Sequence, residues 1–129
     1  MRIPIRIYYE DTDCGGVVYY ANYLKYFERG RTEYLRERGI GLKGLRDGGI
    51  IFVVTKVEVE YLAPGRYDDI LSLDTRLTET SRATITFGHA LRREGSQKEL
   101  VRGVAVLAAV NREGKPVRIP EGLKEALGE

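Results

Sequence analysis

One stretch of the chain has the spacing of a long helix, and it is the only such stretch before a series of strand-like segments. Asn22 is a good helix N-cap, no proline follows for many residues, and Gly39 supplies a stop signal. The apolar residues between them fall near one stripe: Leu24, Phe27, Tyr34 and Leu35. This pattern predicts a helix of roughly 16 residues, about 24 Å long.

Gly30 lies inside this predicted helix, where a glycine costs about 1 kcal/mol relative to alanine. We expect close approach of the helix to a sheet to compensate for this cost.

Strand-like patterns surround the helix. Apolar and polar residues alternate, or the run is almost wholly apolar, in residues 3–9, 50–62, 69–79, 82–93 and 99–111. In the second of these, the pattern predicts one shared face for Ile51, Val53, Val57, Val59 and Tyr61. The turns at 80–81 and 93–98 are short enough for hairpins. Residues 120–127 resemble a short helix with proline near its first turn.

The order β-α-β-β-β-β predicts an α+β fold in which one long helix covers one face of an antiparallel sheet. Such long strands leave the other face and an edge of the sheet to be covered in a chain of 129 residues. We therefore expect a homodimer or a homotetramer.

Length and composition narrow the class of protein. A chain of 129 residues fits a single domain, here residues 1–129. The 21 basic and 19 acidic residues are interspersed, which argues against nucleic-acid binding. The longest apolar run, Val104 to Val110, is too short to span a membrane, and the N-terminus shows no signal peptide. The single cysteine, Cys14, excludes an intrachain disulfide, so we expect a soluble cytoplasmic protein without integral membrane contact.

The loop before the helix carries the residues best suited to chemistry. Asp11 and Asp13 precede Gly15 and Gly16, close to the helix N-terminus. Free backbone N–H groups and the positive end of the helix dipole can polarise a carbonyl there, and a carboxylate can attack it or activate water. Aspartate and glycine also dominate ordinary turns, so the alternative interpretation is that Asp11 and Asp13 are only turn and cap residues.

The segment from Tyr8 to Tyr23 resembles the signature of hotdog-fold acyl-CoA thioesterases, in the YbgC-like branch of the 4-hydroxybenzoyl-CoA thioesterase family. The segments 27–33, 61–69 and 81–83 resemble the same branch, so the likeness covers nearly the whole chain. It implies a hotdog fold, a five-stranded antiparallel sheet wrapped around one long central helix, with a short C-terminal helix.

The resemblance also implies roles for single residues. Asp13 would be the catalytic carboxylate, as nucleophile or general base, and the backbone N–H of Tyr20 would polarise the thioester carbonyl. Many YbgC-like members have histidine where this chain has Tyr20, and either residue supplies the N–H. The acyl-CoA would contact Gly16, Val18 and Tyr19 of the same loop. On charge grounds, Arg82, Arg92 and Arg93 are candidate partners for its phosphates.

No cofactor or metal is expected, because a thioester is already an activated acyl donor and the chain has one histidine, one cysteine and no C-x-x-C motif. Cys14 could be a nucleophile only if a base such as His89 lay beside it. Asp11 is expected to brace the loop through backbone bonds, and Glu28 to form an ion pair with a nearby arginine.

Two other functions remain open at this point. Hotdog folds also serve as dehydratases or hydratases, but those need a histidine near the helix, and His89 falls on a late strand. A non-catalytic module that binds acyl-CoA or acyl carrier protein would keep the fold without needing Asp13.

Overall fold

A computed structural model of the chain describes residues 1–128; the last residue of the predicted domain, Glu129, lies outside the described residues. The strands are β1 (Arg2–Arg6), β2 (Ile51–Tyr61), β3 (Ile70–Thr80), β4 (Thr84–Arg93) and β5 (Glu99–Val110). The helices are α1 (Asn22–Glu37), α2 (Leu42–Asp47) and α3 (Glu121–Leu127), with a short 3-10 turn at Tyr9–Asp11. The expected helix, strands and C-terminal helix are confirmed.

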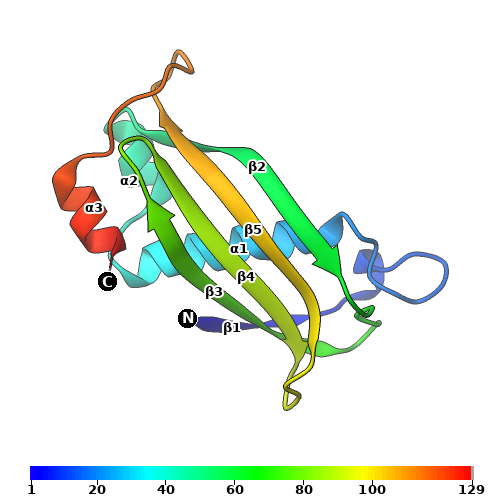
Figure 1. Cartoon of the computed structure of the whole chain (residues 1–129). Helices are drawn as coiled ribbons and strands as arrows, with labels where there is room; N and C mark the ends of the chain where they lie inside the picture. Colours follow the sequence, from blue (N-terminus) through cyan, green and yellow to red (C-terminus); the bar gives the residue numbers. More distant parts are fainter. Residues whose placement is uncertain (129) are drawn as a thin grey trace.

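The five strands form one antiparallel sheet in the order β1-β3-β4-β5-β2. The sheet curves around α1, which runs behind it along most of its width (Figure 1). This is the predicted α+β hotdog arrangement. Of the described strands, β1 and β2 form the two edges of the sheet.

Helix α1 begins one residue earlier than it would if Asn22 were the cap. Ala21 occupies the N-cap position, and Asn22 is the first helical residue. The prediction that Asn22 caps the helix is therefore wrong. Its side chain instead donates from Nδ2 to the carbonyl oxygen of Asp11, 2.8 Å away, because the preceding loop folds back onto the helix start.

Gly30 lets α1 press against the sheet, as expected. A Cβ at this position would lie 2.7 Å from Leu73 Cδ2 and closer still to Thr75 Oγ1, both on β3. Real Cβ atoms do not approach neighbours this closely, so the site excludes even alanine without movement. The propensity lost at Gly30 is offset by the apolar surface that close packing buries.

Strand β2 contains an irregularity that changes which side chains share a face. Its pairing with β5 shifts between Val54 and Lys56, so one residue is unpaired. Val57 lies opposite Ala105, which is fully buried, whereas Val53 lies opposite Ala108 on the other face. The prediction that Ile51 and Val53 share the face of Val57 is therefore wrong, because a bulge reverses the alternation.

Two apolar clusters fill the space between α1 and the sheet. One lies around Tyr26, Phe27 and Leu91, toward the start of α1. The other lies around Tyr34 and Phe87 and extends to α3. Both hold α1 rigidly along its length, so the loop that leads into it has a fixed base.

Candidate active site

The loop between β1 and α1 folds as a tight hairpin with Asp13 at its tip. The backbone N–H of Asp13 donates to the carbonyl of Val17 at 2.9 Å, and the N–H of Gly16 donates back to the carbonyl of Asp13 at 3.1 Å. Gly16 has a φ of +79°, a conformation that favours glycine. Asp13 Oδ1 accepts one hydrogen bond, from the N–H of Gly15 at 2.8 Å. No group within residues 1–128 donates a hydrogen bond to the other carboxylate oxygen, and the side chain is exposed.

Asp11 braces this loop, as predicted. Its carboxylate accepts the N–H of Tyr8 at 2.8 Å. Its carbonyl oxygen accepts two donors, the N–H of Tyr19 at 2.9 Å and the side chain of Asn22 at 2.8 Å. The two ends of the loop are therefore tied to one residue beside α1.

Backbone donors remain free where the chain enters α1. The N–H groups of Asn22 and Tyr23 donate to the carbonyls of Tyr19 and Tyr20, at 2.9 and 3.4 Å. Within residues 1–128, the N–H groups of Tyr20 and Ala21 have no such acceptor. Free N–H groups at the positive end of a helix dipole are suited to bind an oxyanion.

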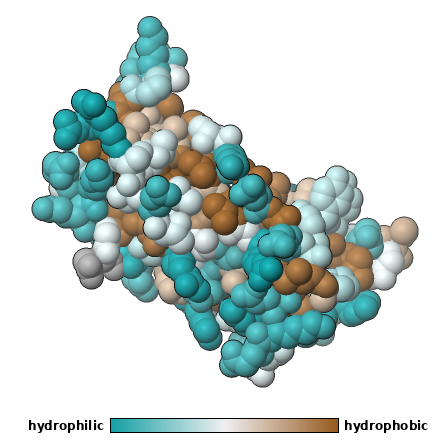
Figure 2. Space-filling view, viewed as in Figure 1, coloured by the Kyte–Doolittle hydropathy of each residue, from teal (hydrophilic) through white to brown (hydrophobic). Residues whose placement is uncertain are grey.

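An apolar cleft of about 300 Å³ lies beside these donors. Its lining residues come from the loop, from α1 and from the end of β2: Val18, Tyr20, Tyr23, Tyr61, Leu62, Ala63 and Pro64. Apolar surface reaches solvent where β2 ends, at the right of the space-filling view (Figure 2). Burial raises the pKa of Tyr23 and of Tyr61, so both hydroxyls stay protonated near neutral pH.

Hydrogen bonds fix the walls of this cleft. The hydroxyl of Tyr61 donates to the carbonyl of Tyr20 at 3.3 Å. The hydroxyl of Tyr23 accepts the N–H of Gly65 at 2.9 Å, and the carbonyl of Gly65 accepts the N–H of Val18 at 2.8 Å. The segment after β2 therefore holds both the loop and the helix start.

The three predicted phosphate partners do not gather in one place. Arg82 is exposed in the turn between β3 and β4, whereas Arg92 and Arg93 end β4 at its opposite end. Arg92 pairs with Glu99 at 2.9 Å. Arg93 pairs with Asp69 at 3.0 Å and donates to the carbonyl of Pro64 at 2.9 Å, so it supports the wall of the cleft.

His89 lies in the core, away from the loop. Arg31 Nη1 lies 3.2 Å from His89 Nε2, and Thr75 Oγ1 lies 3.1 Å from His89 Nδ1. Because a guanidinium only donates, Nε2 accepts and Nδ1 carries the proton. Burial, with the charge of Arg31, lowers the pKa of His89 to about 3. A histidine with both nitrogens bonded in the core has no access to substrate.

The other candidates from the sequence fall outside this arrangement. Cys14 is exposed on the loop tip, far along the chain and the fold from the buried His89. Glu28 accepts the hydroxyl of Thr32 at 2.6 Å, and no arginine among residues 1–128 forms an ion pair with it. The predicted ion pair of Glu28 is therefore wrong, because a threonine one turn along α1 takes its place.

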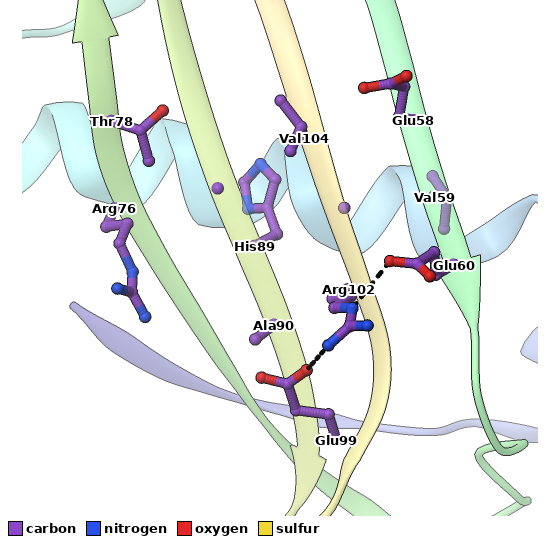
Figure 3. A pocket seen from close by; sticks show the side chains of 12 residues that line it. Glu58, Val59, Glu60, Arg76, Thr78, His89, Ala90, Glu99, Arg102 and Val104 are labelled. Atoms are coloured by element: carbon purple, nitrogen blue, oxygen red, sulfur yellow. Dashed lines mark hydrogen bonds and ion pairs between the residues drawn. The ribbon is translucent and has the colours of Figure 1, made fainter.

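A larger hollow, of about 640 Å³, lies on the outer face of the sheet, opposite α1. Figure 3 shows Arg102 reaching toward Glu60 and Glu99, with N–O distances of 2.9 and 3.4 Å. Asp13 and Tyr20 do not line this hollow. Since each charged side chain that lines this hollow already has an ion-pair partner, either within it or beside it, the smaller cleft beside the helix start is the better candidate site.

Tyr61 completes the cleft, and the sequence patterns did not assign it to the site. The alternation in residues 50–62 placed Tyr61 on an apolar face, but nothing in that pattern showed that this face would meet the start of α1.

Among the described residues, no three His, Cys, Asp or Glu side chains gather into a group that could hold a metal ion. Within the same range, each helix is too short or too polar to cross a bilayer.

The chain matches the family model of the thioesterase-like superfamily over residues 8–127. The chain belongs to this superfamily. The acyl-CoA thioesterase YbgC of Haemophilus influenzae is 40% identical over 125 residues, which cover 95% of this chain and 90% of that protein.

Two further comparisons agree with this membership. The acyl-CoA thioester hydrolase YbgC of Escherichia coli is 46% identical over 86 residues, 67% of this chain and 64% of that protein. The match therefore spans a little under two thirds of the Escherichia coli relative. The crystal structure of a probable thioesterase from Bartonella henselae is 35% identical and superposes with a TM-score of 0.87, over 93% of this chain and 98% of that one.

Proposed function

We propose that this member of the superfamily is an acyl-CoA thioesterase, which hydrolyses the thioester of an acyl-CoA to a free acid and CoA. The single observation that carries the proposal is the juxtaposition of an exposed carboxylate, Asp13, with unbonded backbone donors at Tyr20 and Ala21, on one loop. The YbgC relatives support the substrate class, since they are named for acyl-CoA hydrolysis.

In the proposed reaction, the thioester carbonyl lies against the N–H of Tyr20, and the positive end of α1 stabilises the oxyanion. Asp13 either attacks the carbonyl carbon directly or removes a proton from the attacking water. The carbon–sulfur bond then breaks, and the departing thiolate takes up a proton. Where Asp13 is the nucleophile, this leaves a mixed anhydride of the acyl group and Asp13, which water hydrolyses to the free acid; where Asp13 is the base, the oxygen of the attacking water ends in the free acid directly. Gly16, Val18 and Tyr19 would contact the substrate beside this carbonyl, and Arg82, Arg92 and Arg93 remain candidates for its phosphates.

The proposed active unit is a single hotdog domain, residues 1–129, in a homodimer or a larger homo-oligomer. The support is the unpaired edge of β2, flanked by exposed apolar side chains that include Leu24, Val54 and Val57. A free strand edge beside apolar surface is a template for another chain. We place the protein in the cytoplasm, in keeping with a free, exposed thiol at Cys14.

The test is release of thiol from a panel of acyl-CoAs, with short aliphatic, long aliphatic and aromatic acyl groups. Wild type and Asp13→Asn are compared, and a thermal melt checks that the variant folds. Loss of a catalytic carboxylate lowers kcat by roughly 10²–10⁴-fold if it acts as a general base. Turnover by wild type that is lost in a folded Asp13→Asn supports the proposal.

The alternative is a module that binds acyl-CoA or acyl carrier protein without hydrolysing it. It predicts that wild type and Asp13→Asn bind acyl-CoA equally and that neither releases thiol. That result would overturn the proposed hydrolysis.

A further inference from the structure

The peptide that joins Tyr20 and Ala21 is hydrogen-bonded on one side and open on the other. Its N–H, which belongs to Ala21, has no acceptor within residues 1–128. Its carbonyl, which belongs to Tyr20, accepts the N–H of Tyr23 at 3.4 Å and the hydroxyl of Tyr61 at 3.3 Å. A trans peptide group is planar, with its N–H and C=O on opposite sides, so whatever holds the carbonyl also aims the N–H.

The neighbouring peptide, between Tyr19 and Tyr20, is held in a different way. Its carbonyl accepts the N–H of Asn22 at 2.9 Å, within the turn that leads into α1. The N–H of Tyr20 is therefore aimed by the local chain. The carbonyl behind the N–H of Ala21 has two longer bonds, and one of them comes from Tyr61 on β2, 41 residues away in the chain.

The surroundings of Tyr61 hold its side chain against this carbonyl. Tyr61 is the last residue of β2, where the strand ends beside the loop into α1 (Figure 1). Its ring lies edge-on to the ring of Tyr20, with 6.2 Å between the centroids, and 5.7 Å from the ring of Tyr23. Since burial raises the pKa of Tyr61, its hydroxyl keeps the proton that it donates near neutral pH.

The free N–H groups of Tyr20 and Ala21 are adjacent at the start of α1. Ala21 has helical dihedral angles, φ −71° and ψ −20°, and the first N–H groups of a helix have no partner within it. Successive backbone N–H groups in such a turn can bind one anionic oxygen together. The negative charge on the substrate oxygen is greatest near the tetrahedral intermediate, so a second donor stabilises the transition state more than the bound thioester.

We propose that the N–H of Ala21 is a second oxyanion donor, and that Tyr61 is the positioning residue that aims it through the carbonyl of Tyr20. The inference rests on the proposed thioesterase function. A carbonyl that accepts a hydrogen bond also makes the N–H of its own peptide a stronger donor, because hydrogen bonds in a chain polarise one another. Tyr61 thus acts on the reacting carbonyl without touching it.

Tyr61→Phe tests the role of the hydroxyl, with the acyl-CoA that wild type hydrolyses best as substrate. The variant keeps the ring, and with it the wall of the cleft, and removes only the bond to Tyr20. Loss of a whole oxyanion donor costs about 10²–10³-fold in kcat. Because the N–H of Ala21 remains, we expect kcat to fall about tenfold, with KM within about twofold of wild type. A hydroxyl that only contacted bound substrate would raise KM and leave kcat unchanged.

Tyr34→Phe is the matched control, because it removes the same kind of bond toward the other end of α1. The buried hydroxyl of Tyr34 donates to the carbonyl of Leu127 at 2.9 Å. We expect this variant to lose at least as much thermal stability as Tyr61→Phe and to keep the kcat of wild type. An equal fall of kcat in both variants would show that loosening of α1 lowers the rate, and would overturn the proposal.

A double variant tests whether Tyr61 acts through Ala21. Lactic acid in place of Ala21, introduced by suppression of a stop codon, replaces the N–H by an oxygen and keeps the methyl group. We expect this change alone to lower kcat about 10²-fold or more. Tyr61→Phe added to it should lower kcat by less than about twofold further, because the donor that Tyr61 aims is gone. Effects that multiply would mean that Tyr61 acts on another group, and would overturn the proposal.

The carbonyl stretch of bound substrate gives a readout that does not depend on turnover. Acyl-CoA that is isotope-labelled at the thioester carbonyl carbon is bound to Asp13→Asn, and the stretch is recorded by difference infrared spectroscopy. Hydrogen bonds from the oxyanion donors lower its wavenumber. Tyr61→Phe added to Asp13→Asn should reduce this lowering, whereas Tyr34→Phe added to Asp13→Asn should leave it unchanged.

The outcomes separate this inference from the function on which it rests. A wild-type kcat in Tyr61→Phe or with lactic acid at position 21, or a carbonyl stretch that Tyr61→Phe does not alter, would overturn the inference while hydrolysis stands. If wild type hydrolyses no acyl-CoA, the proposed thioesterase function itself fails.

Discussion

The start of α1 and its middle differ in how completely their polar groups are bonded. In the middle, Arg31, His89 and Thr75 form a buried chain, with His89 bonded at both ring nitrogens. At the start, the N–H groups of Tyr20 and Ala21 have no acceptor within residues 1–128. The first N–H groups of a helix have no partner within the helix, so these donors are available to a ligand beside the exposed carboxylate of Asp13.

This difference separates activity from stability along a single helix. Changes at the start of α1 should alter turnover while the fold persists. Changes in the middle should alter the free energy of unfolding while each folded molecule stays active.

Of the changes that test this comparison between the start and the middle of α1, the one at the backbone donor of Tyr20 should have the largest effect. Tyr20→Pro removes the N–H, and loss of one oxyanion donor costs about 10²–10³-fold in kcat. Tyr20→Phe keeps the N–H, so we expect its kcat to remain within about twofold of wild type. Steady-state kinetics on both variants, with thermal melts, tests this. Equal loss of kcat in the two variants would assign the role to the side chain instead.

Gly30→Ala tests the middle of α1, where we expect a substitution to change stability rather than activity. Alanine normally stabilises a helix by about 1 kcal/mol over glycine. Here the new Cβ meets Leu73 and Thr75, and overpacking costs typically about 1–3 kcal/mol. We expect the free energy of unfolding to fall, measured by urea denaturation.

Gly122→Ala in α3 is the matched control for Gly30→Ala, because a Cβ there has no atom within 4 Å. It should be neutral or stabilising. If both substitutions stabilise the protein, the expected clash of a Cβ at position 30 with β3 does not occur.

Acidic pH should lower the free energy of unfolding through His89, which packs against the middle of α1. Burial and the Arg31 charge hold the folded-state pKa of His89 at about 3, below the ordinary value of 6.5. Between these two values the unfolded chain binds a proton that the folded chain does not. This contribution to stability is therefore complete above about pH 6.5 and falls by about 1.4 kcal/mol per pH unit below it.

Denaturant unfolding at a series of pH values would measure this loss, with His89→Gln as the comparison. Carboxylates contribute to acid unfolding of both proteins, and their contributions cancel in the difference. The variant should lose stability less steeply between pH 6.5 and 4. Parallel curves would mean that His89 is accessible to protons in the folded state.

The sequence predicted the fold more completely than the site, and particular residues show why. The period of 3.6 around Phe27 and the strand alternations are local patterns, so helix, strands and sheet follow from them. The bulge at Val54–Lys56 interrupts such a pattern and reversed part of the predicted face of β2. Helix α2, six residues with three apolar or small positions, is too short to produce a clear period.

The loop around Asp13 could be found because its residues are close in sequence and match a family signature. The wall that Tyr61 supplies could not, since it depends on where the end of β2 meets the start of α1, 41 residues away. The ion pairs that occupy Arg92 and Arg93 depend likewise on contacts between distant segments.

The smallest expected effect concerns the hydrogen bond that ties the preceding loop to the start of α1. Asn22 donates from Nδ2 to the carbonyl of Asp11 at 2.8 Å and so ties the loop to α1. Asn22→Ala removes this bond, which should cost about 1 kcal/mol of stability. Because the same loop carries Asp13, we expect kcat to fall several-fold as well.

Asn111→Ala is the control for Asn22→Ala: Asn111 accepts two backbone N–H groups in the turn after β5, at 3.0 and 2.9 Å. It should lose similar stability with kcat unchanged, and equal kcat in both variants would show that the bond of Asn22 supports only the fold.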